Sequence, residues 1–69
     1  MPKFDIDDIV YSIIRDTIQE CIVKSIDIYK EKQLNIEYSL SVLISKSDTI
    51  FKKSEKYIFK TKNQLIKSL

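Results

Sequence analysis

The sequence contains no glycine, no histidine and no tryptophan, and it has one proline, Pro2, and one cysteine, Cys21. Without glycine, the chain has no phosphate-cradling loop of the P-loop or dinucleotide-binding type. Without histidine, it has no side chain that ordinarily titrates near neutral pH and no imidazole ligand for a metal. One cysteine excludes an intramolecular disulfide and a zinc site. These absences argue against catalysis, and we expect a protein that is not an enzyme and uses no cofactor or metal.

Long hydrophobic runs are also absent, since no uninterrupted apolar run exceeds three residues. A transmembrane helix needs about 20 such residues, and a signal peptide needs a continuous apolar segment. Together with the single cysteine, this predicts an intracellular protein, cytoplasmic by default. A chain of 69 residues forms one domain at most. So small a domain buries only about 60% of its unfolded surface, which favours stabilisation by a partner or by self-association.

The sequence does contain a pattern that repeats every seven residues in its last third. Each copy has an apolar pair, a lysine and a hydroxyl residue, and the copies occupy residues 43–47, 50–54, 57–61 and 64–68. Residues seven apart return to nearly the same direction in an α-helix, whereas in a strand successive copies would alternate between faces. The repeat therefore predicts a helix whose large apolar pairs and small hydroxyl residues receive a second helix, with lysines along the border.

The first half of the chain also shows helical spacing of its apolar residues. Asp5 is a credible N-cap, and the pattern predicts a helix from about residue 5 to about residue 31. The segment 30–35 holds the best break, so a second helix is predicted from about residue 36 to about residue 68. The expected fold is all-α: an antiparallel helical hairpin of two long amphipathic helices, coiled-coil-like and completed by oligomerisation. A further break near residues 45–48 would instead give a three-helix bundle.

One segment conflicts with this interpretation. Apolar residues alternate with mostly polar ones over residues 34–44, which is typical of a half-buried strand. Ile36, Leu40 and Ile44 nevertheless continue the face set by the downstream repeat, so we favour a helix. The less favoured alternative is an α+β fold with a strand at 34–44.

The first functional hypothesis is a protein–protein interaction or assembly module that acts through apolar helix faces, for example a small adaptor or inhibitor. Two helices can each bury one stripe, and several apolar residues lie off these stripes, which indicates contact with a second copy or a larger partner. The expected interface consists of residues on the two facing stripes: Ile14, Ile18, Cys21, Ile44, Phe51, Tyr57, Ile58 and Leu65.

The second hypothesis is salt-dependent, sequence-nonspecific binding of nucleic acid by the lysine-rich C-terminal helix. Residues 46–69 hold seven lysines against Asp48 and Glu55, and Tyr57 and Phe59 are available for stacking. Arginine, the usual base-reading side chain, is nearly absent, so contacts should go to the backbone. The expected anion contacts are Lys46, Lys53, Lys56, Lys60 and Lys67. A membrane-surface helix has less support, because the chain lacks tryptophan and its first half offers a complementary helix.

Overall fold

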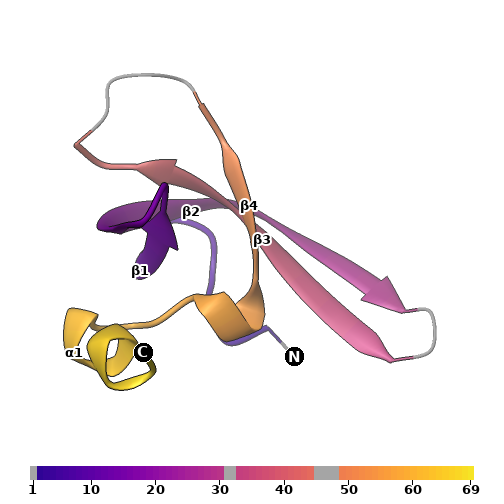
Figure 1. Cartoon of the computed structure of the whole chain (residues 1–69). Helices are drawn as coiled ribbons and strands as arrows, with labels where there is room; N and C mark the ends of the chain where they lie inside the picture. Colours follow the sequence, from indigo (N-terminus) through magenta and orange to yellow (C-terminus); the bar gives the residue numbers. More distant parts are fainter. Residues whose placement is uncertain (1, 31–32, 45–48) are drawn as a thin grey trace.

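The computed structural model of the chain describes residues 2–30, 33–44 and 49–69. Four strands come first, β1 (Ile9–Ile14), β2 (Thr17–Lys30), β3 (Leu34–Val42) and β4 (Phe51–Ser54). A 3-10 helix, η1 (Glu55–Tyr57), and a short α-helix, α1 (Lys62–Lys67), follow. The strands form one antiparallel sheet in the order β1-β2-β3-β4 (Figure 1). The protein is therefore mostly β, with one short helix near its C-terminus.

The predicted all-α helical hairpin is wrong, and so are the three-helix bundle and the coiled coil. The first predicted helix, residues 5–31, contains β1 and β2; the second, residues 36–68, contains most of β3, then β4, η1 and α1. Isoleucine and valine are dense in β1 and β2, and β-branched side chains lose rotamer freedom in a helix but pack well on a pleated sheet. The proposed break at residues 45–48 lies outside the described residues.

The heptad repeat does not correspond to a repeated structure. Its second copy forms β4, its third runs from the end of η1 into extended chain, and its fourth lies in α1. Its first copy lies partly outside the described residues. Segments of similar sequence thus adopt three different conformations, because each packs in a different tertiary environment.

A two-residue turn without glycine joins β1 to β2. Arg15 and Asp16 both have positive φ angles, 52° and 63°, while Ile14 pairs directly with Thr17. Positive φ at both central positions is the geometry that matches the twist of a hairpin, and it is usually supplied by asparagine, aspartate or glycine. The hairpin therefore forms with Asp16 at one turn position but without the glycine that usually accompanies it.

The sheet bends and nearly closes on itself. The first half of β2 pairs with β1, the second half pairs with β3, and the register shifts between Val23 and Ser25 at a bulge. Bulges bend a strand and increase its twist. Beyond η1, Phe59 meets the outer edge of β1, where its N–H donates to the Tyr11 carbonyl at 2.9 Å and its carbonyl accepts from the Tyr11 N–H at 2.7 Å. The chain that follows the last strand therefore returns to the first.

The core fills the inside of this curved sheet. Alternate residues of each strand point inward, so β1 contributes Val10, Ser12 and Ile14, all buried. The buried apolar cluster comprises Phe4, Val10, Ile14, Cys21, Val23, Ile36, Tyr38, Leu40 and Ile58. Leu65 of α1 is also buried. Phe4 and Tyr38 meet edge to face with ring centroids 5.4 Å apart, an arrangement that aromatic pairs favour.

Cys21 lies at the centre of this core and is expected to be unreactive. Its side chain is fully buried, and burial raises the pKa of the thiol to about 11. Because the thiolate is the reactive species, thiol–disulfide exchange of the folded protein at pH 8 should be slow, with full reaction after denaturation. Thiol titration with a chromogenic disulfide measures both rates. A Cys21→Ser/Asn63→Cys variant, with its thiol on exposed α1, is the matched control and should react at once; equally fast reaction of folded wild-type protein would contradict the prediction.

Candidate functional site

The segment that follows β4 is held against the sheet by a buried hydroxyl. The Tyr38 hydroxyl donates to the Glu55 carboxylate at 2.6 Å and accepts from the backbone N–H groups of Lys3 and Phe4 at 3.0 and 3.3 Å. Glu55 also accepts from the Lys3 N–H at 3.2 Å. Burial first, and the hydrogen bond to Glu55 second, raise the pKa of Tyr38 to about 12. This hydroxyl ties the N-terminal segment, β3 and η1 together.

Two further ties fix the same segment to β1. The buried Ser12 hydroxyl donates to the Tyr57 carbonyl at 2.8 Å, and the paired hydrogen bonds between Tyr11 and Phe59 follow two residues later. Residues 55–59 are thus anchored to β1 and β3. Side chains that point outward from this segment consequently have a fixed backbone beneath them.

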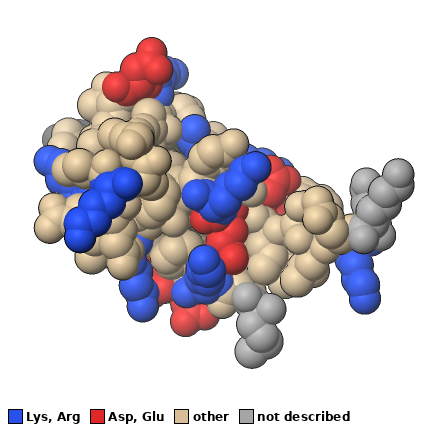
Figure 2. Space-filling view, turned by 60° about the horizontal axis from the view of Figure 1, so that its bottom comes forward, with Lys and Arg blue, Asp and Glu red and all other residues tan. Residues whose placement is uncertain are grey.

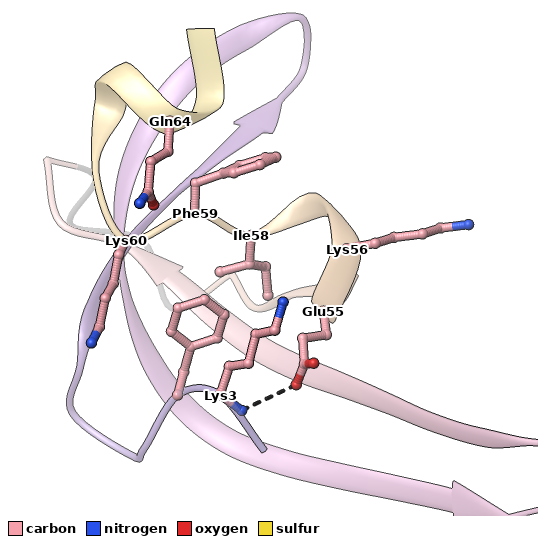
Figure 3. A pocket seen from close by; sticks show the side chains of 8 residues that line it. Lys3, Glu55, Lys56, Ile58, Phe59, Lys60 and Gln64 are labelled. Carbon is pink, nitrogen blue, oxygen red and sulfur yellow. Dashed lines mark hydrogen bonds between the residues drawn. The ribbon is translucent and has the colours of Figure 1, made fainter. Parts of the chain in front are cut away.

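A hollow of about 410 Å³ lies on one side of this segment (Figure 3). Phe4 and Ile58, both buried, contribute its apolar part. In the close-up, the Gln64 side chain points into the hollow, whereas the ends of Lys56 and Lys60 extend away in different directions. The full lining consists of Lys3, Phe4, Glu55, Lys56, Ile58, Phe59, Lys60 and Gln64. It is an apolar depression with cationic side chains around it.

A second hollow, of about 350 Å³, lies between the same segment, β1 and α1. It is lined by Ile13, Lys53, Lys56, Tyr57, Phe59, Leu65, Ser68 and Leu69. Lys56 and Phe59 line both hollows, so the two depressions flank one stretch of chain. We call the two hollows together the η1 groove. Within it, the Lys56 ammonium lies 5.1 Å from the centroid of the Tyr57 ring, within the range of a cation–π contact.

The surface that carries η1 and α1 is rich in lysine. Figure 2 turns the bottom of Figure 1 toward the reader and shows several lysine and arginine side chains on this face, with acidic ones between them. The described residues 49–69 contain six lysines and one acidic residue, Glu55, a net charge of +5. Four lysines line the two hollows, whereas Glu55 is the one acidic side chain in their lining, so the groove is suited to anionic ligands.

A different kind of surface is formed where β2 and β3 extend beyond the other strands, a projection that Figure 1 shows plainly. The β1 pairing on β2 ends at Ile22, and the β4 pairing on β3 ends at Glu37. Further out, the two strands pair with each other in the described part of the chain. We call residues 25–30 and 34–36 the β2–β3 arm. In the described part of the chain, β1 and β4 do not extend along the outer edges of this arm.

The β2–β3 arm carries exposed apolar side chains. Direct cross-strand partners share a face, so Ile28 lies beside Ile36, and Leu34 lies beside Lys30. This face continues into the core through Ile26 and Tyr38, which also pair directly. Ile28 is 56% exposed and Leu34 is 52% exposed. The other face presents exposed Tyr29 beside Asn35.

The structure separates the residues that the sequence placed in one helical interface. Ile14, Cys21, Ile58 and Leu65 are buried, and Ile18 and Phe51 are half-buried. Ile44 and Tyr57 are exposed, but Ile44 follows β3 whereas Tyr57 ends η1. The eight residues therefore do not form one continuous surface.

The predicted lysine contacts are partly brought together. Lys53 and Lys56 line the second hollow, Lys56 and Lys60 line the first, and Lys67 lies in α1. Lys46 lies outside the described residues. Sequence reasoning missed Lys3, which reaches the first hollow from the opposite end of the chain, and it missed the anchoring pair Tyr38 and Glu55. Pattern reading carries no signal for such contacts, because they depend on how the sheet curls.

The described residues contain no group of three or more histidine, cysteine, aspartate or glutamate side chains placed to hold a metal ion. Two tyrosine hydroxyls donate to glutamate carboxylates within the fold, that of Tyr38 to Glu55 and that of Tyr11 to Glu20. Across the described ranges, no helix has the length and apolar character needed to cross a membrane. The η1 groove and the β2–β3 arm are therefore the two candidate binding surfaces of the described residues.

Comparison with known proteins gave no match to a family model, to a curated protein or to a solved structure.

Proposed function

We propose that the protein is a non-enzymatic assembly module that pairs with a second copy of itself through the β2–β3 arm. The observation that carries this proposal is the exposure of Ile28 and Leu34, each more than half exposed on a face that continues into the core. A contiguous apolar patch on a projecting element is characteristic of an interface. A two-stranded ribbon is also only marginally stable alone, so covering the arm would stabilise it.

The chemistry of the arm favours a second copy as the partner. Among its described residues, Lys30 and Asp27 are the charged ones, so the arm has no net charge. The buried centres of interfaces are depleted in charged residues. Lys30, at the end of β2 beside Leu34, is the one charged described residue of the arm on this face, because Asp27 lies on the opposite face with Tyr29. The surface that matches such a largely apolar sheet face is another such face, and a two-fold axis brings identical faces together. Dimerisation would then cover Ile28 and Leu34 of both chains at once.

Light scattering after gel filtration tests this proposal. The wild-type protein is expected to elute with twice the mass of one chain, at low and at high salt, because apolar contacts are not screened by ions. Ile28→Lys and Leu34→Lys should each give monomers with an unchanged circular dichroism spectrum, since both positions are largely exposed and lysine there would place a charge in the contact.

The matched control is Ile66→Lys, which introduces the same charge at an exposed apolar position on α1. This variant should remain dimeric. A wild-type monomer at high micromolar concentration would contradict self-pairing, as would equal dissociation of the Ile66→Lys variant.

We further propose a cytoplasmic location, which the single cysteine and its buried, protonated thiol favour.

A further inference from the structure

We infer that the η1 groove binds single-stranded nucleic acid, with its lysines on the phosphates and its aromatic side chains against the bases. This activity is independent of the β2–β3 arm, because the lining residues of the groove come from other parts of the chain. The inference rests on three features of the groove: its charge, its exposed aromatic ring and its fixed backbone.

The charge of the groove comes from four lysines. Lys3 and Lys60 line the first hollow, Lys53 lines the second, and Lys56 lines both. Glu55 also lines the first hollow, so the lining side chains carry four positive charges and one negative charge, and its carboxylate accepts from the Tyr38 hydroxyl and the Lys3 N–H. Lysines around two hollows that share one stretch of chain can contact successive phosphates of a polyanionic backbone. Since none of the lining residues is arginine, the contacts should be to phosphates rather than to base edges.

The aromatic residues distinguish nucleic acid from an acidic peptide. Tyr57 is 56% exposed, and half-buried Phe59 lines both hollows. The faces of unpaired bases stack on such rings, with little dependence on sequence. An acidic peptide would use the lysines but would bring no flat base to stack on the exposed ring. A duplex keeps its bases stacked inside, so the single strand is the form that fits.

The backbone beneath these side chains is positioned before any ligand arrives. Ser12 holds the Tyr57 carbonyl, Tyr11 pairs with Phe59, and Tyr38 holds Glu55. The Lys56 ammonium already lies over the Tyr57 ring, where a phosphate beside a stacked base would meet it. A surface held in its bound arrangement loses less entropy on binding than a flexible one.

Fluorescence anisotropy with labelled oligothymidylate and oligouridylate of about 12 nucleotides tests the inference. With four lysine–phosphate contacts, log K should fall with log salt with a slope of about −3, which is about 50-fold weaker binding between roughly 50 and 200 mM salt. Lys56→Ala should reduce the slope to about −2. Tyr57→Ala should weaken binding about tenfold and leave the slope unchanged.

The matched control is Lys24→Ala, which removes an exposed lysine of β2 that does not line the groove; it should change neither affinity nor slope. Absence of binding at the lowest salt would overturn the inference. So would a Lys24→Ala effect as large as that of Lys56→Ala, because binding would then be spread over the whole surface. Displacement of the oligonucleotide by oligoglutamate at equal charge concentration would show that the groove selects acidic peptides instead.

Discussion

Replacing Leu40 by alanine is expected to lower the free energy of unfolding by about 2–5 kcal/mol. Leu40 is fully buried in the middle of the sheet, where its strand neighbours are Val23 of β2 and Phe51 of β4. The substitution removes three carbons from the core and leaves a cavity that three strands cannot easily collapse. Because a small domain has only about 5–15 kcal/mol of stability in total, urea unfolding should show a much lower midpoint, or no folded baseline.

The matched control for this substitution is Leu43→Ala. Leu43 lies just beyond β3 and is 44% exposed, and its backbone N–H, which donates to the Glu20 carbonyl, is unaffected by the change. Leu43→Ala should lower the free energy of unfolding by less than about 1 kcal/mol. Equal destabilisation by the two variants would show that the inner face of the sheet is not packed as described.

Replacing Tyr38 by phenylalanine is expected to lower the free energy of unfolding by about 1–3 kcal/mol. The variant keeps the ring that packs on Phe4 but loses the hydroxyl that serves Glu55, Lys3 and Phe4. The buried Phe4 N–H is then left without its acceptor, which costs more than the loss of an ordinary exposed hydrogen bond. Urea titration at neutral pH measures the difference. The control is Tyr11→Phe, which removes an exposed hydroxyl bound to Glu20 at 2.8 Å and should cost under about 0.5 kcal/mol.

The same hydroxyl gives this prediction a pH dependence. The pKa of Tyr38 is raised from its ordinary value, about 10, to about 12 in the folded protein. A raised pKa means that folding favours the protonated form, so the contribution is complete below pH 10 and is lost as the pH rises toward 12. Tyr38→Phe should therefore lose less stability than wild type over this range. Parallel pH profiles of the two proteins would contradict the assignment of the buried proton to Tyr38.

The sequence contained a correct strand signal that the heptad repeat outweighed. Alternation over residues 34–44 reflects β3, in which Ile36, Tyr38 and Leu40 all point into the core. A repeat of seven residues indicates a helix only where one regular element underlies all of its copies. The repeat instead spans a strand, a 3-10 helix and an α-helix. Only tertiary packing distinguishes these conformations, since each segment can pack its apolar pair against the fold in a different way.

In the first half, two periodicities coexist in one sequence. Val10 and Ile14 are four residues apart, which fits one face of a helix and equally one face of a strand. The decisive element was the turn at Arg15 and Asp16, and it carries no glycine. Positive φ angles at such residues are uncommon. A turn of this kind can be recognised only when the strands on either side of it are known. Without that turn, the spacing of the apolar residues favours a continuous helix.

The candidate sites show what pattern reading can and cannot recover. An excess of lysine in the C-terminal third is visible in the sequence, and the structure places Lys53, Lys56 and Lys60 around the η1 groove. The addition of Lys3 depends on the Tyr38 hydroxyl binding the N-terminal backbone. The β2–β3 arm depends on where β1 and β4 stop pairing. How far each strand pairs with its neighbour is determined by the complete sheet rather than by any local segment.

The pairing of Phe59 with Tyr11 has a consequence for unwanted association. The outer edge of a first strand is normally a row of unpaired N–H and C=O groups that can template aggregation. Here a residue 48 positions further along the chain occupies that edge at Tyr11. The Tyr11 N–H and carbonyl are thereby occupied, which makes the β1 edge a poorer template for a further strand. Within the described sheet β4 is the other edge strand, so we expect unwanted strand pairing to begin there or on the β2–β3 arm rather than at β1.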